Sequence, residues 1–148
     1  MLIRKAHPND REEWARMRNL LWPGSPDEHL KDIDEYFLKS AKHLAEVFVL
    51  EKTDGKLGGF IELNFRNTAE GSEAIQVPYV EGWFVDVALR KKSYGTQLME
   101  AAEKWAMRNG FFELASDTEL ENSQSIAIHK KLNFIETDRV VCFIKKLR

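Results

Sequence analysis

The sequence predicts an α/β or α+β fold in which a mixed, mostly antiparallel central sheet carries helices on both faces. Its 148 residues are 43% hydrophobic and 31% charged, which suits a single domain, residues 1–148, with a substantial core. The spacing of apolar residues changes between strand-like and helix-like in the order βααβββαβα, and strands follow the last helix. No repeat, low-complexity tract or Pro/Ser-rich linker interrupts that order. The elements are therefore expected to share one sheet.

The first part of the chain is expected to form one strand and two short helices. Leu2 to Ala6 is the strand, and Asp10 with Glu13 forms a capping box before the first helix. The turn sequence Trp22-Pro23-Gly24 ends that helix. Ser25-Pro26 then starts the second helix, with a serine N-cap and proline at the first helical position.

The middle of the chain predicts a hairpin and a central strand. Ala45 to Glu51 and Leu57 to Phe65 are expected to be antiparallel strands, joined by a turn that contains Asp54-Gly55. A loop follows from Arg66 to Val77. Tyr79 to Val87 is apolar on both faces, which is typical of a strand covered by helices on both sides.

The last third is expected to alternate helices with short strands. One helical stripe runs from Leu98 to Ala106, and Gly110 is placed to end its helix. A second stripe runs from Ser125 to Leu132, with His129 on its inward side. The strands expected here are Phe112 to Ala115, Phe134 to Glu136 and Val140 to Lys145.

Composition argues against several classes of protein. Lys and Arg number 22 against 24 Asp and Glu, so no overall basic charge recommends a nucleic acid partner. No apolar run is long enough to span a membrane, and Met1 to Lys5 does not open a secretory leader, so a cytoplasmic protein is expected. A single cysteine, Cys142, allows no internal disulfide. The four histidines lack paired ligand spacing, so we expect no metal site.

The junction between the central strand and the next helix, Asp86 to Thr96, is the most informative segment. Three basic residues, Arg90 to Lys92, precede a helix start, where free backbone N–H groups and the helix dipole attract anions. The segment therefore suits a pyrophosphate. An ordinary basic loop with a tight turn at Gly95 is the alternative that local features leave open. No P-loop or dinucleotide-binding fingerprint occurs.

This junction resembles a known motif. Arg90-x-x-Ser93-x-Gly95, within the run from Glu81 to Trp105, is similar to the coenzyme A pyrophosphate motif of the GNAT superfamily of N-acetyltransferases. The order of elements resembles that superfamily over essentially the whole chain, which implies a GNAT fold with acetyl-CoA as cosubstrate. Ser93 stands where the motif has glycine, and a serine there is strained if the backbone requires a positive φ.

A narrower resemblance rests on four separated segments. They are Leu21 to Pro26, Glu81 to Val85, Ala115 to Thr118 with Glu121-Asn122, and Phe134 to Val140, and they are similar to the aminoglycoside 6'-N-acetyltransferases. The family's loop tyrosine has no counterpart near Asn67-Thr68. The resemblance implies antibiotic resistance as the role, a homodimer, and an aminoglycoside site lined by Trp22, Glu81, Asp117 and Asp138. It also implies that acetyl-CoA is held by Trp83, Phe84, Val85, Lys91, Lys92, Ser93, Tyr94, Gly95, Thr96 and Asn122.

The chemistry of such a site is consistent with these residues. An aminoglycoside is a polycation, and a local cluster of carboxylates would attract it although the whole chain is nearly neutral. A single carboxylate on a loop is ordinarily just solvated. Glu81 is different, because a carboxylate inside an apolar strand is costly unless it has a partner or a cavity.

The expected reaction is direct attack of a neutral amine on the acetyl thioester in a ternary complex. A backbone N–H from Phe84 to Val87 would stabilise the oxyanion. Asp117 is our first choice to take the ammonium proton and Glu81 the second, although both could act only as cation anchors. His129 stands where the superfamily often has a tyrosine that protonates the leaving thiolate. It could equally be a core-edge histidine, because a thiolate leaves with little help.

Two other functions remain open at this point. The same chemistry could act on another small amine, such as a polyamine, an amino sugar or a peptide N-terminus. The chain could also be a non-catalytic module that binds acyl-CoA and releases no free thiol.

Overall fold

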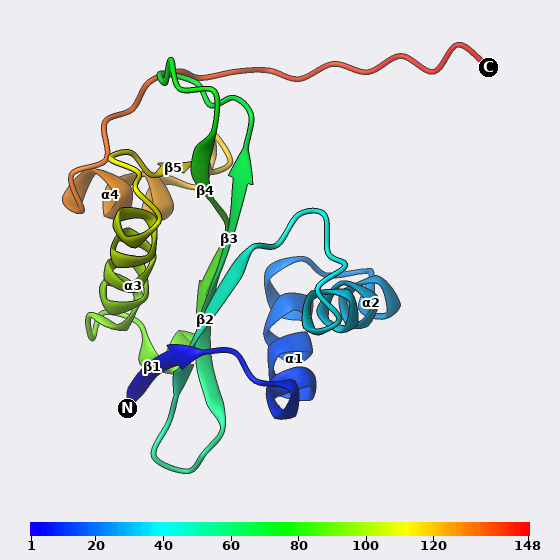
Figure 1. The fold of residues 1–148 in the computed structure, drawn as a ribbon, viewed down its shortest axis with the longest axis vertical. Helices are drawn as coiled ribbons and strands as arrows, with labels where there is room; N and C mark the ends of the chain where they lie inside the picture. Colours follow the sequence, from blue (N-terminus) through cyan, green and yellow to red (C-terminus); the bar gives the residue numbers. More distant parts are fainter.

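The computed structural model describes residues 1–148 and has a five-stranded sheet at its centre (Figure 1). The strands are β1 (Leu2–Lys5), β2 (Glu46–Glu51), β3 (Leu57–Arg66), β4 (Val77–Val85) and β5 (Ala115–Ser116). They lie side by side in chain order, antiparallel from β1 to β4, and β5 runs parallel to β4. The predicted mixed, mostly antiparallel sheet is therefore confirmed.

Helices cover both faces of this sheet, as predicted (Figure 1). The helices α1 (Arg11–Leu21) and α2 (Pro26–Phe37) lie on one face, and α3 (Tyr94–Arg108) lies on the other, with α4 (Ser123–Lys131) close to β5. Each face has its own apolar core, centred on Trp14 and Phe60 beside α1 and α2, and on Ile61 and Leu98 beside α3. None of the helices combines the length and apolarity that a membrane span needs.

The start of α1 differs from the predicted capping box. Asp10 belongs to a short 3-10 turn (Pro8–Asp10), and its carboxylate accepts hydrogen bonds from the Arg4 guanidinium and the His7 N–H instead of capping α1. Glu13 does not reach back to this cap. Its carboxylate accepts from the Leu57 N–H at 3.3 Å, so the two expected cap residues attach α1 to the sheet.

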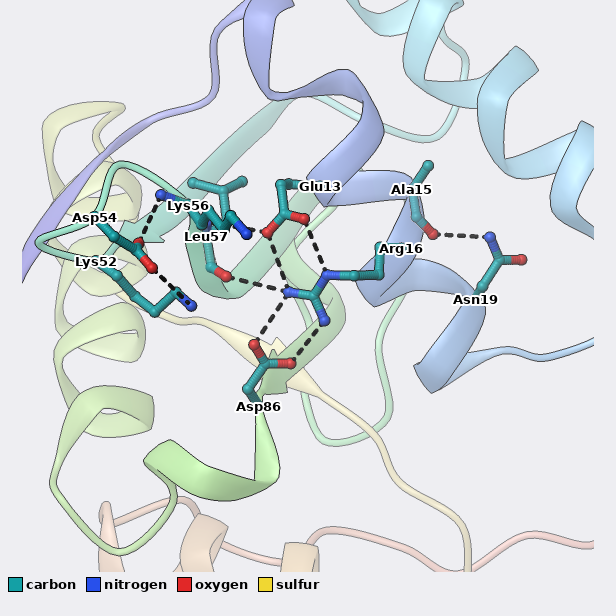
Figure 2. A network of polar contacts seen from close by, with 9 residues as sticks. All are labelled: Glu13, Ala15, Arg16, Asn19, Lys52, Asp54, Lys56, Leu57 and Asp86. Carbon is teal, nitrogen blue, oxygen red and sulfur yellow. Dashed lines mark hydrogen bonds and ion pairs between the residues drawn. The ribbon is translucent and has the colours of Figure 1, made fainter.

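A network around Arg16 connects α1 to the end of β4 (Figure 2). The guanidinium donates to both oxygens of Asp86 at 3.1 Å, to the Leu57 carbonyl at 3.1 Å, and to Glu13. The hydrogen bond to Asp86 is the main cause of the raised pKa of Arg16. Because Asp86 follows β4 directly, α1 anchors the point at which the chain enters the basic loop.

The C-terminal part of the chain contradicts the sequence prediction. No strand follows α4, so the strands expected at Phe134 to Glu136 and Val140 to Lys145 are wrong, and β5 covers two residues and not Phe112 to Ala115. After a hydrogen bond from Thr137 Oγ1 to the Glu70 carbonyl, the chain extends away from the sheet (Figure 1). We call residues 139–148 the C-terminal arm. Its composition is that of a strand, but a strand needs a neighbouring backbone and the arm finds none within its own chain.

Candidate active site

A cavity of about 540 Å³ lies where β4, α3 and α4 meet. It contains eight of the ten residues expected to hold acetyl-CoA: Trp83, Phe84, Val85, Lys91, Ser93, Gly95, Thr96 and Asn122. Lys92 is exposed outside it, and Tyr94 packs against the core beside α3. The cavity also contains residues that sequence reasoning did not select, among them Arg90, Gln124 and Lys131.

The rim of this cavity fits a pyrophosphate. Helix α3 begins at Tyr94, so the N–H groups of its first turn have no intrahelical partner and face the loop. Arg90, Lys91 and Lys131 bring positive charge to the same cavity. Trp83 Nε1 donates to the Gly95 carbonyl at 3.1 Å, which fixes the helix start against β4. The donor set therefore suits the phosphates of coenzyme A.

Ser93 adopts the conformation that its glycine counterpart would favour. Its φ is 66°, in the left-handed region, and Lys91 has φ 62°. A non-glycine residue in this region costs roughly 1–2 kcal/mol. The loop thus keeps the left-handed backbone at position 93 and carries the strain anticipated from the sequence.

A β-bulge at Glu81 separates the two ends of β4. Gly82 pairs with Glu62 and Val80 pairs with Leu63, so Glu81 is the extra residue on its strand. Bulges re-aim side chains next to active sites. Beyond Val80 the chain also loses its other neighbour, because β5 pairs only with Tyr79 and Val80. The remaining length of β4 is open to the cavity on that side.

Glu81 has the partner that its position requires. Arg66, the last residue of β3, forms a two-pronged ion pair with it, from Nε to Oε1 and from Nη2 to Oε2, both at 2.7 Å. This pairing is the main cause of the raised pKa of Arg66. The cost of placing a carboxylate in an apolar strand is thereby offset.

Asp117 lies directly after β5 and joins the same group of side chains. Tyr79 donates its O–H to Asp117 Oδ2 at 2.7 Å, and the Arg66 guanidinium carbon lies 3.6 Å from the centre of the Tyr79 ring. Burial and the bond to Asp117 raise the pKa of Tyr79. We call Glu81, Arg66, Tyr79 and Asp117 the acceptor network. The network brings the two predicted acids, Glu81 and Asp117, together through Arg66 and Tyr79. Sequence reasoning missed these two residues as parts of the site, because it treated Arg66 as a loop residue and Tyr79 as a strand residue.

Trp22, the residue that follows α1, packs on β4 at Gly82, which is next to Glu81 in the sequence. Gly82 has no side chain, and a Cβ at that position would lie 2.5 Å from Trp22 Cη2, so the indole packs directly on β4 beside Glu81. The Trp22 carbonyl is bonded to His29 Nε2 at 2.7 Å, which fixes the turn after α1. The half-buried ring remains partly open to solvent, as expected of a residue that stacks on a sugar.

A buried ion pair lies behind the acceptor network. Glu62 is 1% exposed, accepts from Trp14 Nε1 at 2.9 Å, and lies 3.2 Å from Arg18 Nε. Burial raises the pKa of Glu62 to about 7, against the attraction of Arg18. Sequence reasoning missed this carboxylate because it concentrated on the acids of the matching segments.

The remaining two predicted residues lie apart from the acceptor network. Asp138 is exposed just before the C-terminal arm, accepts from the Arg139 N–H, and makes no contact with Glu81 or Asp117. His129 Nδ1 is 2.7 Å from the Ser125 carbonyl, which only accepts, so Nδ1 carries the proton, and Nε2 is 2.8 Å from Ser116 Oγ. This geometry is that of a core-edge histidine. No three His, Cys, Asp or Glu side chains converge as metal ligands would.

Comparison with known proteins agrees with this arrangement. Residues 14–134 match the model of the acetyltransferase (GNAT) family. An aminoglycoside N(6')-acetyltransferase type 1 of Klebsiella aerogenes is 38% identical over 147 residues, which cover 99% of this chain and 97% of that protein.

Solved structures show the same likeness. AAC(6')-Iy in complex with the bisubstrate analogue CoA-S-monomethyl-acetylneamine has a TM-score of 0.88 at 35% identity, covering 98% of this chain and 97% of that one. The 6'-N-acetyltransferase AAC(6')-IG from Acinetobacter haemolyticus has a TM-score of 0.86 at 33% identity, covering 100% of both chains. The expected GNAT fold and the acetyl-CoA cosubstrate are confirmed. The chain therefore belongs to the acetyltransferase (GNAT) family and, within it, to the aminoglycoside N(6')-acetyltransferases.

Proposed function

We propose that this enzyme transfers an acetyl group from acetyl-CoA to the 6'-amine of aminoglycoside antibiotics and so confers resistance. The observation that carries the proposal is an acceptor network with two carboxylates that is built on β4, the same strand whose last residues, Trp83 to Val85, line the cavity that suits coenzyme A. The chain also matches 6'-N-acetyltransferases over its full length. An acidic site complements a polycationic acceptor.

We assign the binding of acetyl-CoA to the eight residues named above that line the cavity. The first turn of α3, with Lys91, would hold the pyrophosphate, and Trp83 to Val85 with Asn122 would hold the pantetheine arm. When bound, acetyl-CoA supplies an activated carbonyl carbon. A backbone N–H from Phe84 to Val87 would donate to its oxygen as negative charge develops there, and the early end of the β4–β5 ladder supports this role.

We assign the acceptor to Trp22, Glu81 and Asp117, and we leave out Asp138 because it lies apart from this group. Asp117 would take the proton from the 6'-ammonium, directly or through water, so that a neutral amine attacks. One of its oxygens accepts from Tyr79, which leaves the other for the substrate. Trp22 would lie against a ring face, and Glu81, already paired with Arg66, would border the sugar.

We give His129 a secondary role. Its two ring nitrogens already have partners in Ser125 and Ser116, which supports a positioning function against Trp83 over that of an acid for the leaving thiolate. A thiol has a pKa of about 8.5, so the thiolate leaves with little help from an acid.

The proposed regiochemistry is tested by a pair of aminoglycosides. Kanamycin, with a 6'-amine, should release free coenzyme A thiol and gain one acetyl group at that amine. Paromomycin, with a hydroxyl at the same carbon, should be a very poor substrate, because no serine-type activation pair is available for an alcohol. A free-thiol assay and NMR of the product give the rate and the position.

Other outcomes of this experiment are equally informative. Acetylation on the 2-deoxystreptamine ring, or equal turnover of paromomycin, would exclude the 6' assignment. Stabilisation by coenzyme A without thiol release for any amine would make the chain a binding module.

We further infer that residues 1–148 form one domain, that the enzyme works in the cytoplasm, where acetyl-CoA is available, and that two copies pair. Pairing is supported by the C-terminal arm, where Phe143 and Ile144 are each 92% exposed, an unfavourable arrangement for one copy in water.

The pairing predicts a change of mass in solution. The unaltered chain should sediment as a dimer, and a variant with both Phe143→Asp and Ile144→Asp should sediment as a monomer, because charge would oppose burial of the arm. Leu38→Asp, at an exposed apolar residue outside the arm, is the matched control and should remain dimeric. A monomeric unaltered chain would contradict the inference.

A further inference from the structure

The acceptor network contains a permanent cation where a polycation is to bind. Arg66 pairs with Glu81 through both carboxylate oxygens, at 2.7 Å each, and its guanidinium carbon lies 3.6 Å from the centre of the Tyr79 ring. We propose that Arg66 determines acceptor specificity as a built-in counter-ion of Glu81, which limits how many ammonium groups the site pairs with. This inference rests on the proposed function, because it concerns cationic acceptors.

Arg66 is the more exposed partner of this ion pair. The Arg66 side chain is 41% exposed, whereas that of Glu81 is 19% exposed. An ammonium that binds Glu81 therefore has to compete with a guanidinium that already engages both of its oxygens. Both carboxylate oxygens are already engaged in a planar fork, an arrangement that a single ammonium cannot reproduce.

The charges of the network leave one free negative group. Glu81 is neutralised by Arg66, and Tyr79 contributes a neutral O–H to Asp117. Asp117 forms no ion pair, although its charge contributes, after that of Glu81, to the raised pKa of Arg66. Glu62 has its own cation in Arg18. The site thus has a strong position for one ammonium, at Asp117, while each additional ammonium near Glu81 is repelled by Arg66.

A purely structural role for Arg66 would give the opposite results. If the fork only held Glu81 in a productive position, loss of the fork would weaken the binding of every acceptor. If Arg66 is a competing cation, loss of its charge frees Glu81 for the acceptor, and a lysine that keeps the charge preserves the specificity. The two accounts therefore predict opposite changes in acceptor binding when the Arg66 charge is removed.

The experiment compares Arg66→Gln and Arg66→Lys on two acceptors. Kanamycin B carries one more amine than kanamycin A, at the 2' carbon of the sugar that also carries the reacting 6'-amine. Arg66→Gln should lower KM for kanamycin B about tenfold and for kanamycin A by less, with kcat nearly unchanged, and the gain should shrink in high salt. Arg66→Lys should keep both KM values close to those of the unaltered enzyme.

A matched control removes the same charge elsewhere. Arg11→Gln breaks a similar fork, to Asp34 on the outer surface of α1 and α2, and should leave both KM values unchanged. Higher KM values in both Arg66 variants, or no change in Arg66→Gln, would overturn the inference.

Calorimetric binding of kanamycin B separates this inference from the proposed function. If neither kanamycin is acetylated but Arg66→Gln still binds kanamycin B more tightly, the proposed function fails and the role of Arg66 stands. If both are acetylated and binding is unaffected by Arg66→Gln, the role of Arg66 fails and the function stands.

Discussion

Asp117→Asn is expected to lower kcat for kanamycin about a hundredfold or more, the usual scale of losing a general base. The amide keeps the size of the carboxylate and can still accept the Tyr79 O–H through its carbonyl oxygen. What it loses is the ability to take the ammonium proton. Acetyl-CoA should bind the variant as before, because Asp117 is not part of the cavity beside α3.

The split between kcat and KM decides the role of Asp117. A rise in KM at unchanged kcat would make Asp117 a cation anchor only. Glu113→Gln is the matched control, since Glu113 is an exposed acid a few residues earlier and bonds only to Ser72. Its kcat should equal that of the unaltered enzyme.

Rising pH between about 4.5 and 7 is expected to destabilise the unaltered chain relative to Glu62→Gln. Burial raises the pKa of Glu62 from 4.5 to about 7, so the folded chain keeps a proton that the unfolded chain releases. Protonation therefore favours the folded state at low pH, and this advantage is lost as pH rises through the window. At 1.36 kcal/mol per pKa unit, the free energy of unfolding of the unaltered chain should fall by about 3 kcal/mol relative to that of Glu62→Gln.

Urea unfolding of the unaltered chain and of Glu62→Gln, at pH 5 and at pH 8, measures this effect. The quantity of interest is how much the difference between their free energies of unfolding changes from pH 5 to pH 8. Glu103→Gln, on the exposed side of α3, serves as control and should show no such pH dependence relative to the unaltered chain. Parallel stability profiles for the unaltered chain and Glu62→Gln would contradict the prediction. They would mean that Arg18 fully compensates the burial of the ionised carboxylate.

The parts of the fold that the sequence predicts correctly are those encoded locally. The helical stripe around Leu98 and the proline at the start of α2 act within a few residues, and both helices form where expected. The strands expected after α4 depend on a distant partner backbone. Their residues have the right composition, yet the chain supplies no edge for them, so pattern alone predicts them wrongly.

The candidate site divides in the same way. Trp22, Glu81 and Asp117 are identified from segments that resemble a family, and the structure brings them to the middle of β4. Arg66 and Tyr79 could not be identified because their contacts depend on the bulge at Glu81 and on the register of β3 against β4. A register that shifts by one residue at a bulge leaves no periodic signal in the sequence.

Because Arg16 is attached to Asp86, α1 fixes both the distance and the rotation between the basic loop and Trp22. Arg16 binds Asp86 at the start of the basic loop, and Trp22, just after the helix, packs on β4. Each residue of an α-helix advances the chain by 1.5 Å and about 100°. One inserted or deleted residue between Arg16 and Trp22 would therefore swing the indole off β4 while the loop stayed in place. Insertions and deletions in this chain are consequently expected to be tolerated in the turns around this helix and not within it.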